Sequence, residues 1–127
     1  MNIKEICKLY NIENYKINPD ESIDVDGNVI LFNRRLTKLP LKFNKVTGDF
    51  SCTSNLLTNL EGCPNYVGGN FGCVANNITS LEGCPNYVGG NFNCHLNQLP
   101  EEIRNNPKAE ILRLQRESKL NILLDEY

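Results

Sequence analysis

Apolar and polar residues repeat along most of this chain with a period of 21 residues. The string GCPNYVGGNF occurs at 62–71 and again, unchanged, at 83–92. The same step relates further sets of equivalent positions: Gly27, Gly48, Gly69 and Gly90; Val29, Phe50, Phe71 and Phe92; Leu31, Cys52, Cys73 and Cys94. A pattern that is kept over successive copies predicts a solenoid of about four coils, in which each copy stacks on the next.

Within each coil the residues follow the order apolar-x-apolar-x-x-Asn-x-apolar-x-x-apolar, which is leucine-rich-repeat spacing. The alternation at Phe50 and Cys52 predicts a half-buried strand, and equivalent strands would stack as a parallel sheet on one face. Asn55, Asn76 and Asn97 lie where the chain leaves the strand, so their amides are expected to form a hydrogen-bonded ladder. The segment EGCPNYVGG is expected to be extended chain and turns, because it holds proline and paired glycines.

The N-terminal region departs from this repeat. Apolar residues at positions 3, 6, 7 and 10 share one helical face, which predicts a helix over residues 2–11 with Asn2 as its N-cap. The stretch INPDESIDVDGNVIL predicts an edge hairpin that leads into the first coil, with Asp26 and Gly27 as its turn. The first coil is itself atypical, since Arg34 occupies the ladder position and Asn33 lies one residue early.

The C-terminal region predicts one long helix, which begins at Asn106 and Pro107 and runs to about Leu124. At 127 residues the chain is expected to form a single α/β domain with capping helices at both ends. We divide it into an N-terminal helix and edge cap over 1–24, the repeat solenoid over 25–103 and the C-terminal helix over 104–127.

The amino-acid composition of the chain does not identify a binding partner. The 13 Lys and Arg against 15 Asp and Glu give a net charge of −2, which makes a nucleic-acid partner unlikely without ruling out a local basic patch. The first sixteen residues carry charges every few positions and resemble neither a signal peptide nor a membrane span. We therefore expect a cytoplasmic protein that makes no membrane contact and keeps its six cysteines reduced.

Two segments between residues 48 and 85, GDFSCTSNLLTNLEGCP and VGGNFGCVANNITSLEGCP, resemble the repeats of small leucine-rich-repeat-type proteins encoded by tailed bacteriophages. The lead-in SIDVDGNVILFNRRLTKLPLKF resembles their first coil, so the resemblance covers roughly residues 15–100. It implies a parallel-sheet solenoid made in the cytoplasm of an infected bacterium. It implies no catalytic residue.

The cysteines, the single histidine and the acidic turn raise three chemical hypotheses. Cys52, Cys73 and Cys94 should form a line at about 4.8 Å per coil, which cannot surround a metal tetrahedrally, and no C-x-x-C occurs. His95 follows Cys94 directly, so strand alternation sends the two side chains to opposite faces and excludes a dyad. The DVDG segment lacks the glutamate of a calcium loop. We therefore expect no metal, no cofactor and no enzymatic activity.

The paired glycines at 68 and 69 and at 89 and 90 precede strands rather than helices, and no lysine follows them as in a phosphate loop. We interpret them as turn residues.

The outer face of the predicted sheet is the leading candidate for binding, because alternation places these side chains outward and a solenoid's sheet face is broad. The candidate partner-binding residues are Ile30, Phe32, Asp49, Ser51, Thr53, Val74, Asn93 and His95. Phe32 and Val74 stand out as apolar residues on an otherwise polar surface.

A basic cluster crowds the first coil and its following loop. It consists of Arg34, Arg35, Lys38, Lys42 and Lys45. It could contact phosphates or an acidic protein, or serve only as a solvated rim that protects an end coil.

The C-terminal helix carries apolar residues on two sides. One side holds Ala109, Leu112, Leu120, Leu123 and Leu124; the second holds Ile111, Leu114 and Ile122. The second face could dock a partner or another copy of the chain, or the helix could bend near Glu117 and Ser118 and bury both faces.

From the sequence we expect a non-enzymatic protein-binding module that acts on a host or phage protein, for instance as an inhibitor of a host function. The alternative is a structural component that forms homo-oligomers through the C-terminal helix.

Overall fold

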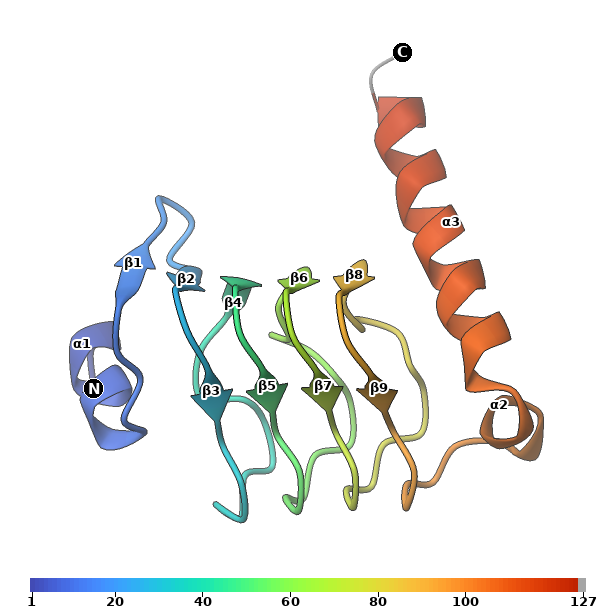
Figure 1. Cartoon of the computed structure of the whole chain (residues 1–127), viewed down its shortest axis with the longest axis horizontal. Helices are drawn as coiled ribbons and strands as arrows, with labels where there is room; N and C mark the ends of the chain where they lie inside the picture. Colours follow the sequence, from blue (N-terminus) through green and yellow to red (C-terminus); the bar gives the residue numbers. More distant parts are fainter. Residues whose placement is uncertain (126–127) are drawn as a thin grey trace.

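The computed structural model describes the backbone of residues 1–125 and the side chains of residues 1–121. Its parallel strands stack as a solenoid of about three turns, followed by C-terminal helices (Figure 1). Sheet A contains, in spatial order, β1 (Tyr15–Ile17), β2 (Ile23–Val25), β4 (Phe43–Val46), β6 (Tyr66–Val67) and β8 (Tyr87–Val88). Sheet B contains β3 (Val29–Ile30), β5 (Phe50–Ser51), β7 (Phe71–Gly72) and β9 (Phe92–Asn93).

The second sheet corrects the prediction of a parallel sheet on one face only. Sheet B is the predicted sheet, whereas sheet A uses the segment around Tyr66 and Tyr87 that the sequence pattern assigned to extended chain and turns, without a second sheet. Val67 is fully buried and Tyr66 beside it is exposed, so this segment alternates as a strand does. Only two residues of each copy form strand pairs in sheet A. So short an alternation, flanked by proline and glycines, is not recognisable in the sequence pattern.

The 21-residue period sets the register of both sheets. In sheet B, Phe50 pairs with Phe71, which pairs with Phe92. In sheet A, Tyr66 pairs with Tyr87. Each pair joins residues 21 positions apart, as the repeat predicts.

Each sheet B strand is followed by a residue in the left-handed backbone region. These residues are Asn33 (φ 53°), Ser54 (φ 58°), Ala75 (φ 57°) and Leu96 (φ 54°). Asparagine tolerates this conformation better than most residues, which explains why Asn33 lies one residue before the ladder position in the first coil.

The predicted asparagine ladder is confirmed. Asn76 Nδ2 donates to the carbonyls of Cys52 (3.0 Å) and Cys73 (3.1 Å), and its Oδ1 accepts the Leu57 N–H (3.0 Å). Asn55 Oδ1 accepts the N–H groups of Arg34 and Leu36, both at 3.0 Å. The ladder therefore provides hydrogen-bond partners for main-chain N–H groups of the first coil, although that coil has no asparagine of its own at the ladder position.

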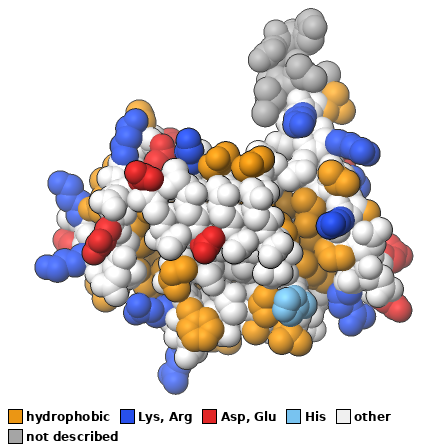
Figure 2. Space-filling view, in the orientation of Figure 1, with side chains coloured by type: hydrophobic (Ala, Val, Ile, Leu, Met, Phe, Trp, Pro, Cys, Tyr) orange, Lys and Arg blue, Asp and Glu red, His pale blue; other side chains and the backbone are white. Residues whose placement is uncertain are grey.

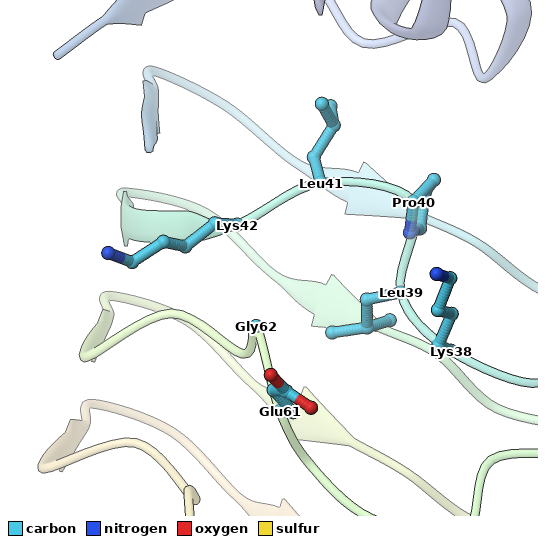
Figure 3. Close-up of a pocket in the computed structure, with 7 residues that line it drawn as sticks. All are labelled: Lys38, Leu39, Pro40, Leu41, Lys42, Glu61 and Gly62. Atoms are coloured by element: carbon cyan, nitrogen blue, oxygen red, sulfur yellow. The ribbon is translucent and has the colours of Figure 1, made fainter. Parts of the chain in front are cut away.

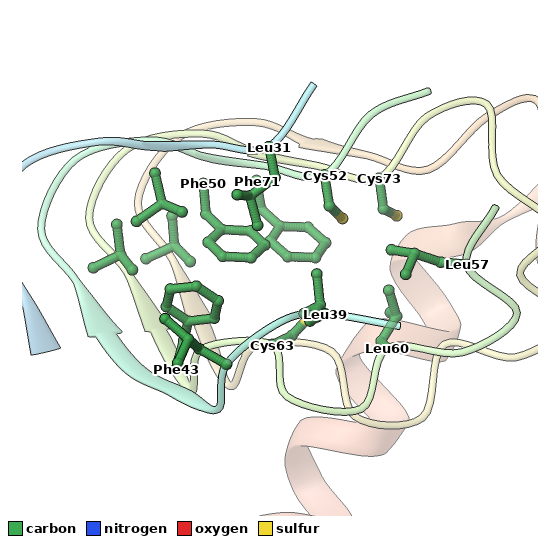
Figure 4. Packing of buried hydrophobic residues seen from close by; sticks show 14 of the residues in the cluster. Leu31, Leu39, Phe43, Phe50, Cys52, Leu57, Leu60, Cys63, Phe71 and Cys73 are labelled. Atoms are coloured by element: carbon green, nitrogen blue, oxygen red, sulfur yellow. The ribbon is translucent and has the colours of Figure 1, made fainter. Parts of the chain in front are cut away.

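The core lies between the two sheets and the loops that join them, and it is lined by equivalent residues of successive coils (Figure 4). Phe50 and Phe71 are fully buried, with ring centroids 5.8 Å apart and nearly parallel planes. Phe43 meets Phe50 edge-on at 5.1 Å. The repeat thus builds a column of stacked aromatic rings inside the solenoid.

The paired glycines form the corners between sheet A and sheet B, and close packing rather than a special turn requires them. A Cβ on Gly69 would lie 2.2 Å from Asp49 Oδ1 and 3.0 Å from the Gly48 carbonyl carbon. A Cβ on Gly68 would lie 2.2 Å from the Thr47 carbonyl oxygen. Both glycines lie in bends of the chain, in agreement with their interpretation as turn residues. Neither has positive φ, so the turn itself does not require glycine; the close approach of neighbouring coils does.

Helix α1 (Ile3–Leu9) lies at the N-terminal end of the solenoid (Figure 1). Asn2 Oδ1 accepts the Glu5 N–H at 2.9 Å, which confirms the predicted N-cap. Cys7 is fully buried in the core. The predicted edge hairpin exists, but it is closed by residues 18–22 between β1 and β2, which pair antiparallel. Asp26 and Gly27 instead form the corner from sheet A to sheet B, which corrects the predicted turn.

The C-terminal end consists of α2 (Glu101–Asn105) and α3 (Pro107–Asp125). The start of α3 at Pro107 confirms the predicted helix start. The helix is continuous, and Leu112 and Leu120 on it are more than half exposed, so it does not bury both of its apolar sides by bending near Glu117 and Ser118. Its first half runs beside the last coil and its C-terminal half extends beyond the sheets (Figure 1). No helix in the described part of the chain is long and apolar enough to cross a membrane.

Candidate functional site

The outer face of sheet B carries exposed apolar side chains at its first coil. Ile30 is 50% exposed and Phe32 is 56% exposed, while Leu31 between them is fully buried. Strand alternation therefore places these two residues outward, as predicted. Figure 2 views this face, where hydrophobic side chains gather near the first coil and again near the histidine of the last coil, with polar surface between.

The other candidate residues of this face are less uniform than predicted. Asn93 and His95 are exposed, but Val74 is only half-buried rather than fully outward. Asp49, Ser51 and Thr53 are half-buried as well. Phe32 and Val74 lie two coils apart with Thr53 at the intervening position, so they do not form one apolar surface.

Asp49 belongs to a second hydrogen-bonded ladder that the sequence did not reveal. We call Asn28, Asp49, Asn70 and Asn91 the surface ladder. In each step a side-chain Oδ1 accepts the main-chain N–H of the equivalent residue in the next coil, at 2.7–2.8 Å. These polar residues thus join successive coils at the start of each sheet B strand. The signal available in the sequence was the recurrence of Asn or Asp one position before each strand.

The five residues of the predicted basic cluster are all exposed, but they do not act as one group. Arg34 lies over the Tyr10 ring at 5.6 Å, and Lys45 on β4 lies over the Tyr66 ring at 5.0 Å. Lys42 Nζ is 3.1 Å from Asp20 Oδ2. The hydrogen bonds from Ser22, aided by Lys42, lower the pKa of Asp20 to about 2. The cluster is therefore divided among separate contacts on both sheets.

Lys38 and Lys42 line an open surface depression of about 640 Å³ together with Glu61 (Figure 3). Leu39, Pro40, Leu41 and Gly62 complete its lining. Figure 3 shows the two lysine side chains spread apart, with Glu61 on the neighbouring coil.

Sheet A carries an exposed aromatic stack that sequence reasoning missed. The rings of Tyr66 and Tyr87 are 4.9 Å apart with planes 12° from parallel, and they are 38% and 51% exposed. The two residues lie in the segment expected to be extended chain and turns, so their common outward direction could not be inferred before the strands were known.

The cysteines occupy the predicted inward lines. Cys52 and Cys73 are fully buried, Cys63 is 7% exposed, and Figure 4 shows their side chains turned into the same interior. Burial raises the pKa of Cys73, and burial together with the neighbouring Cys52 thiol raises that of Cys63. All six thiols are free, and the described residues contain no group of three or more His, Cys, Asp or Glu side chains able to hold a metal.

His95 is exposed whereas Cys94 is 6% exposed on the inner face, so the structure does not bring the two together.

The C-terminal helix contacts the solenoid with the side predicted to be its free second face. Ile111 and Leu114 pack against the core, while Leu112 and Leu120 of the other side are 51% and 55% exposed. The side chain of Ile122 lies outside the described residues. Helical periodicity gave two apolar sides, and only the tertiary structure decides which one meets the solenoid.

A groove separates the last coil from α3, and we call it the end groove. Its main part has a volume of about 680 Å³ and is lined by Val88, Asn91 and Phe92 on one side and by Pro107, Ile111 and Leu112 on the other. A smaller part of about 210 Å³ continues past Phe92 to Leu96 and Arg104. The end groove follows the free edge of β9, the last strand of sheet B.

Comparisons with protein-family models, with curated proteins and with solved structures find no match for this chain.

Proposed function

We propose that this protein is a non-enzymatic protein-binding module that contacts its partner through the outer face of sheet B at the first coil. The observation that carries this proposal is the pair of large apolar side chains at Ile30 and Phe32, each about half exposed beside the exposed Arg34 and Arg35. Apolar anchors next to arginine are typical of the residues that contribute most to protein interfaces.

Burying what remains exposed of the Ile30 and Phe32 side chains would contribute about 2 kcal/mol, or roughly thirtyfold in Kd. The rigid sheet beneath them keeps the loss of conformational freedom on binding small.

We also propose the finer architecture and setting of the module. The solenoid has four coils whose ends are capped by α1 and by α2 with α3, which the burial of Cys7 and the packing of Ile103 and Ile111 against the core support. The resemblance to phage repeats supports a role in the cytoplasm of an infected bacterium, where the partner is a host or phage protein.

The test is a pull-down from infected bacteria with wild type, an Ile30→Ser/Phe32→Ser double variant and a Leu120→Ser control. Leu120 is 55% exposed but lies on α3, at the other end of the solenoid, so this control removes a comparably exposed apolar side chain without touching the proposed face. We expect wild type and control to retain one specific partner and the double variant to lose it. Equal recovery by all three variants, or no specific partner, contradicts the proposal.

A second candidate function is self-association through α3. Leu112 and Leu120 are both more than half exposed on this helix, whose C-terminal half extends beyond the sheets (Figure 1). Light scattering over a range of concentrations should then give a dimer that a Leu112→Glu/Leu120→Glu variant abolishes. A strict monomer at high concentration excludes this function.

A further inference from the structure

The end groove exposes one edge of the last coil. In every earlier coil the equivalent edge is covered by the next coil. In sheet B the Phe71 N–H donates to the Asn91 carbonyl and the Cys73 N–H to the Asn93 carbonyl, each at 2.9 Å. The equivalent N–H groups of Phe92 and Cys94 face the groove, where no further strand follows in the sheet. Unpaired strand edges of this kind readily accept an additional strand.

The surface ladder ends in the same groove. Asn28, Asp49 and Asn70 each accept an N–H from the following coil, and Asn91 is the last member. Among the described residues, no coil follows to donate to Asn91 Oδ1. The groove therefore presents one aimed side-chain acceptor in addition to the main-chain groups of β9.

The aromatic column is only partly covered at this end. Phe50 and Phe71 are fully buried, but Phe92, whose centroid is 4.9 Å from that of Phe71, is only partly covered. Leu96 extends the apolar surface along the smaller part of the groove and is 74% exposed. Small residues, Ser54 and Ala75, take its place in the two preceding coils.

We propose that the end groove binds an extended peptide segment of another protein, which adds a parallel strand to β9. The peptide must offer the same groups that one coil offers to the coil before it. These are a main-chain N–H that donates to Asn91 Oδ1, an apolar side chain over Phe92 and a small apolar side chain two residues further on. The described groove lining carries Lys108 and Arg104 and no carboxylate, so the residues flanking the segment are neutral or acidic.

A second copy of the chain fits less well. Its matching strand with a free edge is β3, and α1 lies on that side of the solenoid (Figure 1). The inference goes beyond the proposed sheet-face function, because the groove and the pair Ile30 and Phe32 lie at opposite ends of sheet B.

The test uses a synthetic peptide with the sequence of residues 69–77, in which Cys73→Ala removes the thiol. In a titration followed by amide NMR, we expect saturable shifts at Phe92, Asn93 and Cys94. Asn91→Ala should weaken binding about fivefold, since it removes one hydrogen bond. Asn28→Ala, at the far end of the surface ladder, should leave binding unchanged.

Methylation of single peptide nitrogens provides a geometric control. In the coils the Asn70 N–H donates backward to Asp49 Oδ1, whereas the Phe71 N–H donates forward. A peptide N-methylated at Asn70 should therefore lose binding, and one N-methylated at Phe71 should keep it.

Absence of saturable shifts, equal effects of the two methylations, or shifts confined to Ile30 and Phe32 would each overturn the inference. Light scattering during the titration identifies dimers, and a dimer that protects the β9 amides without peptide would also overturn it. The Ile30→Ser/Phe32→Ser variant should bind this peptide normally, which separates the inference from the proposed function.

Discussion

Among single residues, the buried asparagines stabilise the fold through several hydrogen bonds each. Asn55 and Asn76 are each only 6% exposed, yet every buried polar side-chain atom of the described residues has a partner. Each amide bonds the main chain of its own coil and of a neighbouring one, so it joins coils where no strand ladder continues. Removing the Asn76 amide would leave the Leu57 N–H without a partner and take one of the two amide donors from the carbonyls of Cys52 and Cys73.

We expect Asn76→Ala to lower the free energy of unfolding by about 3 kcal/mol, because the buried N–H of Leu57 loses its partner and the carbonyls of Cys52 and Cys73 each lose one of two amide donors. Urea unfolding monitored by circular dichroism measures the change. The neighbouring Asn77 is exposed, and Asn77→Ala should change stability by less than about 0.5 kcal/mol. Equal effects of the two substitutions would contradict the ladder's role.

The buried thiols make stability depend on alkaline pH. Burial raises the pKa of Cys73 and Cys63 above the ordinary value of 9.0, and raises that of Cys84 to about 11. The unfolded chain therefore releases these protons first as pH rises. Stability should be constant up to about pH 8 and should fall as pH passes 9.0 toward 11. Urea unfolding at a series of pH values measures this, and Cys84→Ala should reduce the fall; an unchanged slope in that variant would argue against it.

At the scale of elements, the corners decide how closely two coils approach. Sheet A and sheet B meet at glycines because the side-chain oxygen and main chain of the preceding coil occupy the space of a Cβ. The surface ladder and the corner glycines therefore depend on each other. The side-chain oxygen of one coil can accept the N–H of the next coil only because the glycine at that corner has no side chain.

Gly69→Ala should therefore destabilise the protein by about 2 kcal/mol or more, since its Cβ would lie 2.2 Å from Asp49 Oδ1. Gly72→Ala is the matched control, because the nearest atom to its Cβ is Thr53 Oγ1 at 3.3 Å. Thermal unfolding should separate the two by several degrees. If the two glycines tolerate alanine equally, close packing does not explain the corner.

At the scale of the whole molecule, stability should grow with the number of coils, because each coil contacts only its neighbours. The identical strings at 62–71 and 83–92 occupy equivalent places in successive coils, so one more copy would meet the same surroundings on both sides.

A chain with a second copy of residues 63–83 inserted after residue 83 should fold with one additional coil. Its urea m-value should rise, since more surface is exposed on unfolding. An insertion of the same segment shortened by one residue is the control, because it moves the apolar positions of the following strand to the other face. Aggregation of the full-length insertion, or equal stability of both insertions, would contradict the repeat register.

The solenoid, its 21-residue register, the inward line of Cys52 and Cys73 and the asparagine ladder could all be predicted from the sequence. These features depend on positions that recur with a constant period, and periodicity is a property of the chain before it folds. The outward directions of Ile30 and Phe32 followed from the same alternation.

The sequence pattern did not reveal the second sheet, the surface ladder, the reason for the corner glycines or the side of α3 that meets the core. Each of these depends on the distance between coils or on a contact between elements far apart in sequence. Two-residue strands such as Tyr66–Val67 are too short to show a period of their own. Ile111 and Leu112 are equally apolar, and the position of the last coil alone determines that the first is covered and the second exposed.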